Sequence, residues 1–241
     1  MEPLITAINP LDRLFLRRNS QYFRQPKGEC MSEMPMLYGF DGSIYVRIVK
    51  MVLADKGVIY DQLQVNVVEG EPKKPDHLAR HPFGKVPVLD IDGLRIRETD
   101  AICRYLDDSR PGPKLVPASA SDRARMNEAI SMVNSYGYSA MVGAAGYHLF
   151  PDFIGGQDDT AHAACLERLK TLIHSLMENK RDAAWLAGDE VSLADYFLAP
   201  GVFYLSLTPE LQKLTSIADF NFWWKAMQAL PAFSVTAPDV D

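Results

Sequence analysis

The sequence has few cysteines, no long hydrophobic run and no excess of positive charge, and each scarcity excludes a class of protein. Its three cysteines, Cys30, Cys103 and Cys165, are an odd number without a CxxC pair, which fits a reducing compartment better than a disulfide framework. No apolar run is long enough to span a bilayer. The net charge is -6 at pH 7 without a dense Lys/Arg stripe, so we expect no nucleic-acid partner.

Catalytic signatures of strict spacing are missing as well. The chain has no HExxH, no GxSxG, no phosphate-binding Walker loop, no dinucleotide fingerprint and no Cys/His cluster with zinc spacing. The histidines are isolated in the sequence, and we expect each to be a surface or internally satisfied side chain: His77, His81, His148, His162 and His174. No metal is therefore implied.

The chain is long enough for one large core or two modest ones, since it has 241 residues of which 47% are hydrophobic. Residues 1–34 differ from the rest because they are rich in arginine, with only a short apolar patch. We expect a disordered extension there. An organellar transit peptide is the alternative, which the acidic residues of the segment weaken.

The residues from 35 to 110 change period several times. Strand-like runs flank a helical pattern that closes with Gly57, and a short helix follows in KPDHLARH. Two further strands surround the turn at Asp92 and Gly93, and TDAICRYLDD predicts another helix. The predicted order is strand, helix, strand, helix, strand, strand, helix, which makes this part an α/β domain.

The residues after this domain predict a linker and then an all-helical domain. Residues 111–120 are rich in proline and serine, and strand-like alternation is scarce over residues 121–241. One apolar stripe has helical spacing: Leu166, Leu169, Ile173, Leu176 and Met177. Ser192 and Asp195 have the spacing of a capping box at the start of another helix, and Pro231 should stop a late one.

Three motifs in this order, HPFGKVPVL, ETDAICRYL and GDEVSLADYFL, resemble the cytosolic glutathione transferases over nearly all of residues 36–233. The stretch YGFDGSIYVRIV is similar to the serine-type classes, phi especially, in which a serine lies four residues after a glycine and four before an arginine. Here these are Gly39, Ser43 and Arg47. The resemblance implies a thioredoxin-like βαβαββα domain that binds glutathione, followed by a C-terminal helical bundle.

The resemblance also implies where glutathione, the co-substrate, would bind. A cis bond between Val86 and Pro87 would point the backbone N–H and C=O of Val86 into a cleft, where the cysteinyl part of glutathione could pair with them. The helix that begins at Thr99 would offer its N-terminus to the γ-glutamyl carboxylate, and Glu98 would meet the ammonium group. The alternative is a purely structural role, in which Thr99 only caps this helix and Pro87 is an edge-strand or turn proline.

Two lysines are candidates for the glycyl carboxylate of glutathione. Phi-like members have a His-Lys pair before the short helix, and both residues contact the glycyl carboxylate. This sequence has Pro72 and Lys73 there, so one of the two contacts is missing. Lys85, where the family often has glutamine, could supply a compensating charge or could simply be solvated. Weaker glutathione binding than is typical follows from this departure.

Ser43 is the residue on which catalysis would depend. A free thiol has a pKa of about 8.5, so ionising it at neutral pH needs a shift of about two units, or roughly 2.7 kcal/mol. One hydrogen bond from the Ser43 hydroxyl to the thiolate, worth about 1.5–3 kcal/mol, can contribute much of this. Ser43 could also only cap the helix that follows, and Tyr45 is an outside candidate for the same role, whereas Tyr38 should be part of the core.

The resemblance predicts a transferase that conjugates glutathione to a small apolar electrophile, acting in detoxification. We expect the electrophile pocket at Phe40 and Tyr136, although aromatic residues at such spacing are equally typical of ordinary core. A homodimer and a cytoplasmic location are implied, with organellar import by residues 1–34 as the alternative. The competing function is a binding or regulatory protein on the same fold, without turnover.

Overall fold

The computed structural model describes residues 34–239. The predicted N-terminal extension therefore lies outside the described residues, apart from Met34. These described residues belong to one compact unit. Among the described helices, none is both long and apolar enough to cross a membrane.

The first half of this unit has the predicted βαβαββα order, with a short 3-10 turn before its second helix. In chain order its elements are β1 (Met36–Gly39), α2 (Ile44–Asp55), β2 (Asp61–Gln64), η1 (Glu71–Lys73), α3 (Pro75–Leu78), β3 (Val88–Ile91), β4 (Leu94–Arg97) and α4 (Thr99–Ser109). The four strands form one mixed sheet in the order β2-β1-β3-β4, in which β1 is parallel to β2 and antiparallel to β3. The predicted fold class is confirmed for this half.

The hairpin between β3 and β4 forms because of the predicted turn. Asp92 and Gly93 both have positive φ angles, 53° and 74°, which is the backbone of the two-residue turns that match strand twist. Tyr38 in β1 was expected in the core, but this prediction was wrong. Its ring is half-buried under the guanidinium of Arg80, and its hydroxyl donates to Asp90 Oδ2 at 3.1 Å.

The second half is helical, as predicted. Its elements are α5 (Ala120–Met132), the π-turn η2 (Val133–Gly137), α6 (Tyr138–Leu149), η3 (Pro151–Ile154), α7 (Asp159–Lys180), α8 (Leu193–Ser206), η4 (Pro209–Lys213), α9 (Phe220–Gln228) and α10 (Pro231–Val235). The whole predicted apolar stripe of α7 is buried. α9 ends before Pro231, which itself begins α10 because a proline is favoured at the first position of a helix.

Local signals explain where α6 and α8 lie. Ser192 and Asp195 form the predicted capping box at the start of α8. Gly143 of α6 allows close packing against α7. A Cβ on Gly143 would lie 2.6 Å from the Cys165 Sγ of α7, so only glycine allows α6 and α7 to approach this closely.

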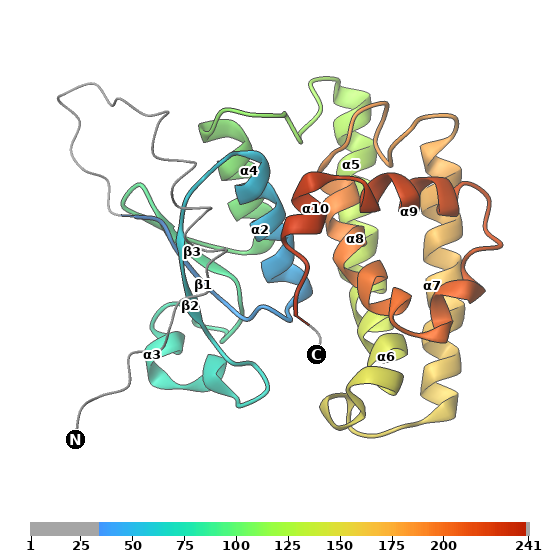
Figure 1. Ribbon diagram of the computed structural model, residues 1–241, viewed down its shortest axis with the longest axis horizontal. Helices are drawn as coiled ribbons and strands as arrows, with labels where there is room; N and C mark the ends of the chain where they lie inside the picture. The colour runs from blue at the N-terminus through green and yellow to red at the C-terminus, as the bar shows by residue number, and fades with distance from the viewer. Residues whose placement is uncertain (1–33, 240–241) are drawn as a thin grey trace, which may run out of the picture. The chain divides into compact units, whose positions relative to one another are not determined.

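The helix α2 joins the two halves. Figure 1 shows α2 and α4 between the sheet and the C-terminal helices, and α2 packs against α4, α8 and α10. Polar contacts cross this junction at both ends of α2, since the Tyr196 hydroxyl donates to Asp55 and the Arg47 guanidinium donates to the Phe233 carbonyl at 2.9 Å. The Arg47 side chain lies between the rings of Phe203 and Phe233, and burial lowers its pKa to about 10.

Candidate active site

Strand register brings three predicted site segments to one edge of the sheet. Tyr38 near the end of β1 pairs with Val88 at the start of β3, and Val88 pairs with Arg97 at the end of β4. The loop after β1, the Val86-Pro87 step before β3 and the Glu98-Thr99 step after β4 therefore all leave the sheet at the same edge. In the sequence, more than forty residues separate the loop after β1 from the Val86-Pro87 step. Antiparallel pairing of the strands brings the segments together.

Ser43 lies at the N-cap of α2, where its side chain is half-buried. Its Oγ accepts a hydrogen bond from the Val46 N–H at 3.4 Å, so the predicted capping role is confirmed. The hydroxyl hydrogen is donated to no other residue between 34 and 239, which leaves it available to a ligand. The neighbouring Gly42 carbonyl accepts a 2.8 Å hydrogen bond from the Tyr204 hydroxyl of α8, and this bond holds the loop against the helical half.

Asp41 anchors the same loop from the sheet side. Its carboxylate accepts from Lys50 Nζ at 2.7 Å and from Gln62 Nε2 at 2.9 Å. Burial raises the pKa of Asp41, but the bonds from Lys50 and Gln62 outweigh burial and place the pKa below its ordinary value. The carboxylate thus stays charged, and the loop that carries Ser43 is fixed at both sides.

The Val86-Pro87 bond is cis, as predicted. Neither the N–H nor the C=O of Val86 bonds to another of the described residues. The preceding carbonyl, that of Lys85, accepts a 2.8 Å hydrogen bond from Nε2 of His77, which lies in α3 and is only 3% exposed. His77 therefore positions the segment that presents the unpaired backbone of Val86.

The N-terminus of α4 presents unpaired backbone donors. Its first intrahelical hydrogen bond runs from the Ile102 N–H to the Glu98 carbonyl at 3.0 Å, so the N–H groups of Thr99, Asp100 and Ala101 precede the helical ladder. Thr99 does not occupy the cap, because the N-cap is Glu98, and the Glu98 side chain makes no capping bond. Thr99 is the first helical residue and is buried.

Glu98 has a strained backbone and an exposed carboxylate. Its φ angle is 67°, a region that non-glycine residues rarely adopt and that is often found at functional sites. The carboxylate lies 3.6 Å from Nε2 of the buried His81. Burial lowers the pKa of His81 despite the nearby Glu98, and the Phe83 N–H donates to His81 Nδ1 at 3.3 Å. His81 is thereby neutral with its remaining proton facing Glu98.

The two predicted lysine contacts differ in their surroundings. Lys73 in η1 donates to the Phe83 carbonyl at 3.0 Å, so its ammonium group is already engaged with the loop before Val86. Lys85 is exposed and forms no ion pair with another of the described residues. Pro72 is buried beside Gly84. Gly84 has a positive φ, and a Cβ at this position would lie 2.5 Å from the Pro72 carbonyl oxygen, so a larger residue is excluded.

The two predicted pocket residues lie on different elements. Phe40 is half-buried in the loop after β1, and Tyr136 is 59% exposed in η2. The Tyr45 ring, facing the helical half, stacks on Tyr138 with 4.6 Å between centroids, and its hydroxyl donates to Asn134 Oδ1 at 3.1 Å. Burial, with smaller contributions from Tyr138 and Glu98, raises the pKa of Tyr45 to about 12, so it is a neutral phenol.

A shallow groove of about 860 Å³ lies elsewhere, along α7, and is lined in part by Lys170, His174, Glu178 and Lys213. None of the predicted site residues lines it.

Sequence reasoning missed three residues that position this site. His77 and His81 lie four residues apart and both are buried, but α3 ends at Leu78, so His81 lies beyond the helix that forms within KPDHLARH. Tyr204 had no local signal, because its partner Gly42 lies 162 residues away. His77 bonds internally to the Lys85 carbonyl, which is one of the two alternatives that we expected for each histidine.

Comparisons with known proteins agree with this architecture. Residues 37–114 match the family described as "Glutathione S-transferase, N-terminal domain". The chain is 30% identical over 199 residues to a probable glutathione S-transferase GSTF2 of Oryza sativa subsp. japonica, which covers 81% of this chain and 92% of the rice protein. The chain belongs to the glutathione S-transferase family, and the predicted resemblance to its phi-like members is confirmed.

Solved structures show the same fold. Glutathione transferase F7 of Populus trichocarpa superposes with a TM-score of 0.76 at 25% identity, covering 85% of this chain and 98% of the poplar chain. Glutathione S-transferase I from maize, solved with an atrazine glutathione conjugate, has a TM-score of 0.75 at 26% identity, covering 85% of this chain and 97% of the maize chain.

Proposed function

We propose that the protein is a glutathione transferase that conjugates the thiolate of glutathione to a small apolar electrophile. The observation that carries this function is the single sheet edge that brings together a free serine hydroxyl, an unpaired Val86 backbone and the open N-terminus of α4. The serine hydroxyl can donate a hydrogen bond to a thiolate, the Val86 backbone can pair with a peptide, and the helix N-terminus can bind an anion. The maize relative that holds a glutathione conjugate supports the same ligand.

Each part of glutathione has a chemical counterpart at this edge. The cysteinyl backbone pairs with Val86, which the Val86-Pro87 step presents, and the γ-glutamyl carboxylate meets the N–H groups at Thr99. The Glu98 carboxylate, which is 75% exposed and lies 3.6 Å from His81 Nε2, meets the ligand's ammonium group. Lys73 and Lys85 face the glycyl carboxylate, and the exposed Lys85 supplies the charge that is missing at Pro72.

Ser43 stabilises the thiolate. It donates its free hydroxyl hydrogen to the sulfur, and the N-terminus of α2 adds about 0.3–1 kcal/mol. With a charged hydrogen bond of about 1.5–3 kcal/mol, this covers the roughly two-unit shift that ionises a thiol at neutral pH. The activated sulfur attacks an electrophile held by Phe40 of the first loop and Tyr136 of the helical half.

The Ser43→Ala variant separates binding from chemistry. Glutathione should bind nearly as well by calorimetry, while conjugation of a chromogenic substrate falls by about one to two orders of magnitude. The pKa of the bound thiol, followed by thiolate absorbance in the ultraviolet, should climb toward the free value. The matched control is Tyr45→Phe, which should leave that pKa unchanged. A thiol pKa that stays low in Ser43→Ala and rises in Tyr45→Phe would transfer the role to Tyr45.

A non-catalytic glutathione-binding or regulatory protein is the second candidate. Pro72 favours it, because proline offers no side-chain donor where phi-like members have a histidine, and Lys73 is engaged with the Phe83 carbonyl. Saturable glutathione binding without conjugation of any of several aryl halide and epoxide substrates would support this alternative.

We further infer a homodimer that acts in cytoplasmic detoxification. Phe83, in the loop before the cis bond, is 72% exposed, and an apolar ring presented to this extent is suited to burial by a second copy. The family membership supports both the dimer and the detoxifying role. Fusion of residues 1–34 to a fluorescent protein tests the alternative of organellar import.

A further inference from the structure

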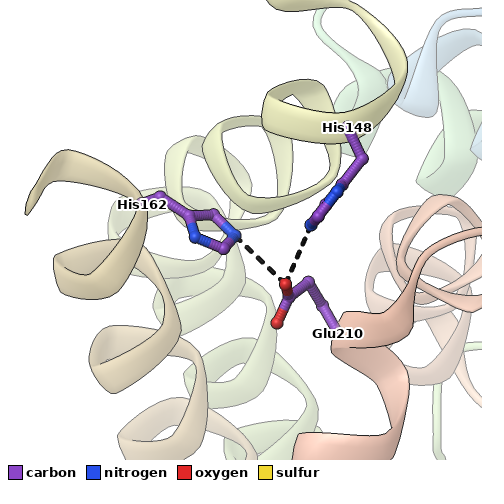
Figure 2. Close-up of side chains that lie close together, drawn as sticks. All are labelled: His148, His162 and Glu210. Atoms are coloured by element: carbon purple, nitrogen blue, oxygen red, sulfur yellow. Dashed lines mark hydrogen bonds and ion pairs between the residues drawn. The ribbon is translucent and has the colours of Figure 1, made fainter. Parts of the chain in front are cut away.

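Two histidines and a glutamate that are far apart in the sequence converge in the helical half. His148 lies in the last turn of α6, His162 in the first turn of α7, and Glu210 in η4. Figure 2 shows both imidazole rings directed at the same carboxylate from different elements. One ligand atom from each of the three residues lies within 4.8 Å of the other two.

The distances within this cluster suit a shared cation. His148 Nε2 lies 2.9 Å and His162 Nε2 lies 3.3 Å from the same oxygen, Glu210 Oε1. Ligands of a tetrahedral zinc ion at 2.0–2.1 Å are about 3.3 Å apart. Replacement of these direct contacts by three bonds to one ion therefore needs only small side-chain movements.

One buried ligand atom of the cluster lacks a hydrogen-bond partner. The buried Nε2 of His162 has no hydrogen bond of normal geometry, although it lies 3.3 Å from Glu210 Oε1. Buried polar groups are normally paired. An imidazole nitrogen that is free to bind a ligand thus faces a carboxylate that is 2% exposed.

The surroundings hold the ligands in place. The Tyr147 ring stacks on His162 with 4.2 Å between centroids, and its hydroxyl donates to Asp159 Oδ1 at 2.6 Å. A metal ligand must be a deprotonated carboxylate, and the Lys213 ammonium group 2.6 Å from Glu210 Oε2 favours that form.

Lys213 is the cation that is paired with the Glu210 carboxylate in this structure. Its Nζ lies 2.6 Å from Glu210 Oε2, so the ammonium group neutralises the carboxylate in the absence of another cation. The Lys213 side chain is 46% exposed and can swing into solvent. A dication bound by the imidazoles at Oε1 would compete with this ammonium group for the charge of the carboxylate.

We propose that His148, His162 and Glu210 form a binding site for a divalent transition metal ion of the zinc type. Two neutral imidazoles and a carboxylate are borderline ligands that favour Zn²⁺ or Co²⁺ over Mg²⁺ or Ca²⁺. Three protein ligands leave a fourth position for water. The ion would fasten the end of α6 to the start of α7 and to η4, independently of glutathione.

Titration of the metal-free, tag-free full chain with ZnCl₂ tests the site, in a buffer without glutathione because thiols bind zinc. Calorimetry should give one ion per chain, and zinc should raise the melting temperature. His148→Ala and His162→Ala should each weaken binding by at least about tenfold, since loss even of a group that only supports a metal ligand costs 10–100-fold. CoCl₂ should produce a visible absorption band that His148→Ala abolishes.

The matched control is His174→Ala. His174 Nε2 lies 3.1 Å from Glu178 Oε1, but this pair is exposed and lacks a third ligand, so its loss should leave zinc affinity unchanged. Cys165→Ser provides a second control, for thiol binding. The proposal is overturned if zinc does not saturate the wild-type chain, or if His174→Ala weakens binding as much as His148→Ala. It is likewise overturned if Glu210→Gln lowers stability while zinc binding persists, because Glu210 would then serve only as an ion-pair partner.

Discussion

Replacement of Asp195 with alanine should destabilise the protein far more than loss of an ordinary helix cap. The carboxylate is fully buried and accepts four hydrogen bonds. Two come from backbone N–H groups, those of Leu186 at 3.0 Å and Ser192 at 2.9 Å. The others come from the Ser192 hydroxyl at 3.1 Å and from Trp223 Nε1 at 2.9 Å. Asp195 therefore joins the start of α8 to the preceding loop and to α9.

The magnitude follows from the donors left behind. Alanine would leave the N–H groups of Leu186, Ser192 and Trp223 without an acceptor, and each unsatisfied buried group costs about 1–3 kcal/mol. Burial raises the pKa of Asp195, and the four hydrogen bonds only partly offset this, so desolvation of the charged form reduces the net gain. We expect a loss of about 3–5 kcal/mol, as on breaking other buried polar sites. That is a large share of the roughly 5–15 kcal/mol by which proteins are stable.

Urea unfolding followed by circular dichroism measures this loss, and the chain contains its own control. Asp158 is the N-cap of α7 and accepts from the Thr160 and Ala161 N–H groups at 2.8 and 2.9 Å, but it is exposed. Asp158→Ala should cost only about 0.5–2 kcal/mol. Equal losses in Asp195→Ala and Asp158→Ala would refute the reasoning, as would a collapse of activity in Asp195→Ala at unchanged stability.

Two further perturbations test the dimer and the junction at the end of α4. Phe83→Ser should shift the dimer toward monomer in light scattering, because burying a phenylalanine is worth about 1.5–3 kcal/mol. A wild-type chain that scatters at monomer mass in micromolar solution would contradict the dimer. Asp107→Asn should cost about 3–5 kcal/mol in thermal unfolding, because it leaves the buried Lys56 ammonium, 2.7 Å away, without its counter-ion. Asp92→Asn is the control, because it breaks the more exposed pair with Arg110 and should cost about 1 kcal/mol or less. Equal losses of stability in Asp107→Asn and Asp92→Asn would contradict the larger contribution expected of the buried pair.

The features that the sequence predicted correctly depend on neighbours along the chain. The turn at Asp92 and Gly93, the cap at Ser43 and the capping box at Ser192 each involve residues within four positions of one another. Their hydrogen bonds form within one turn of backbone, so residue type and spacing suffice to predict them. The buried stripe of α7 was predictable for a related reason, because helical periodicity places its members on one face whatever packs against it.

The family resemblance added what no local pattern could supply, which was a hypothesis for the ligand and the meeting of the segments at Ser43, Val86 and Glu98. The structure then explained this meeting by strand register. The residues that support these segments were not predicted, since His77 acts through the Lys85 carbonyl and Tyr204 through the Gly42 carbonyl. A histidine or tyrosine at these positions looks the same in the sequence whether it contacts solvent or a loop.

The sequence by itself determined the βαβαββα order of the first half, the helical character of the second half, the caps that begin α2 and α8 and the family. Only the tertiary structure decided that Asp195 also binds Trp223, and that His148 and His162 meet Glu210. Glu210 lies 62 residues beyond His148 in the chain. Contacts at such separations arise from the packing of whole helices, which the burial of apolar faces drives and which leaves no spacing rule in the residues that it brings together.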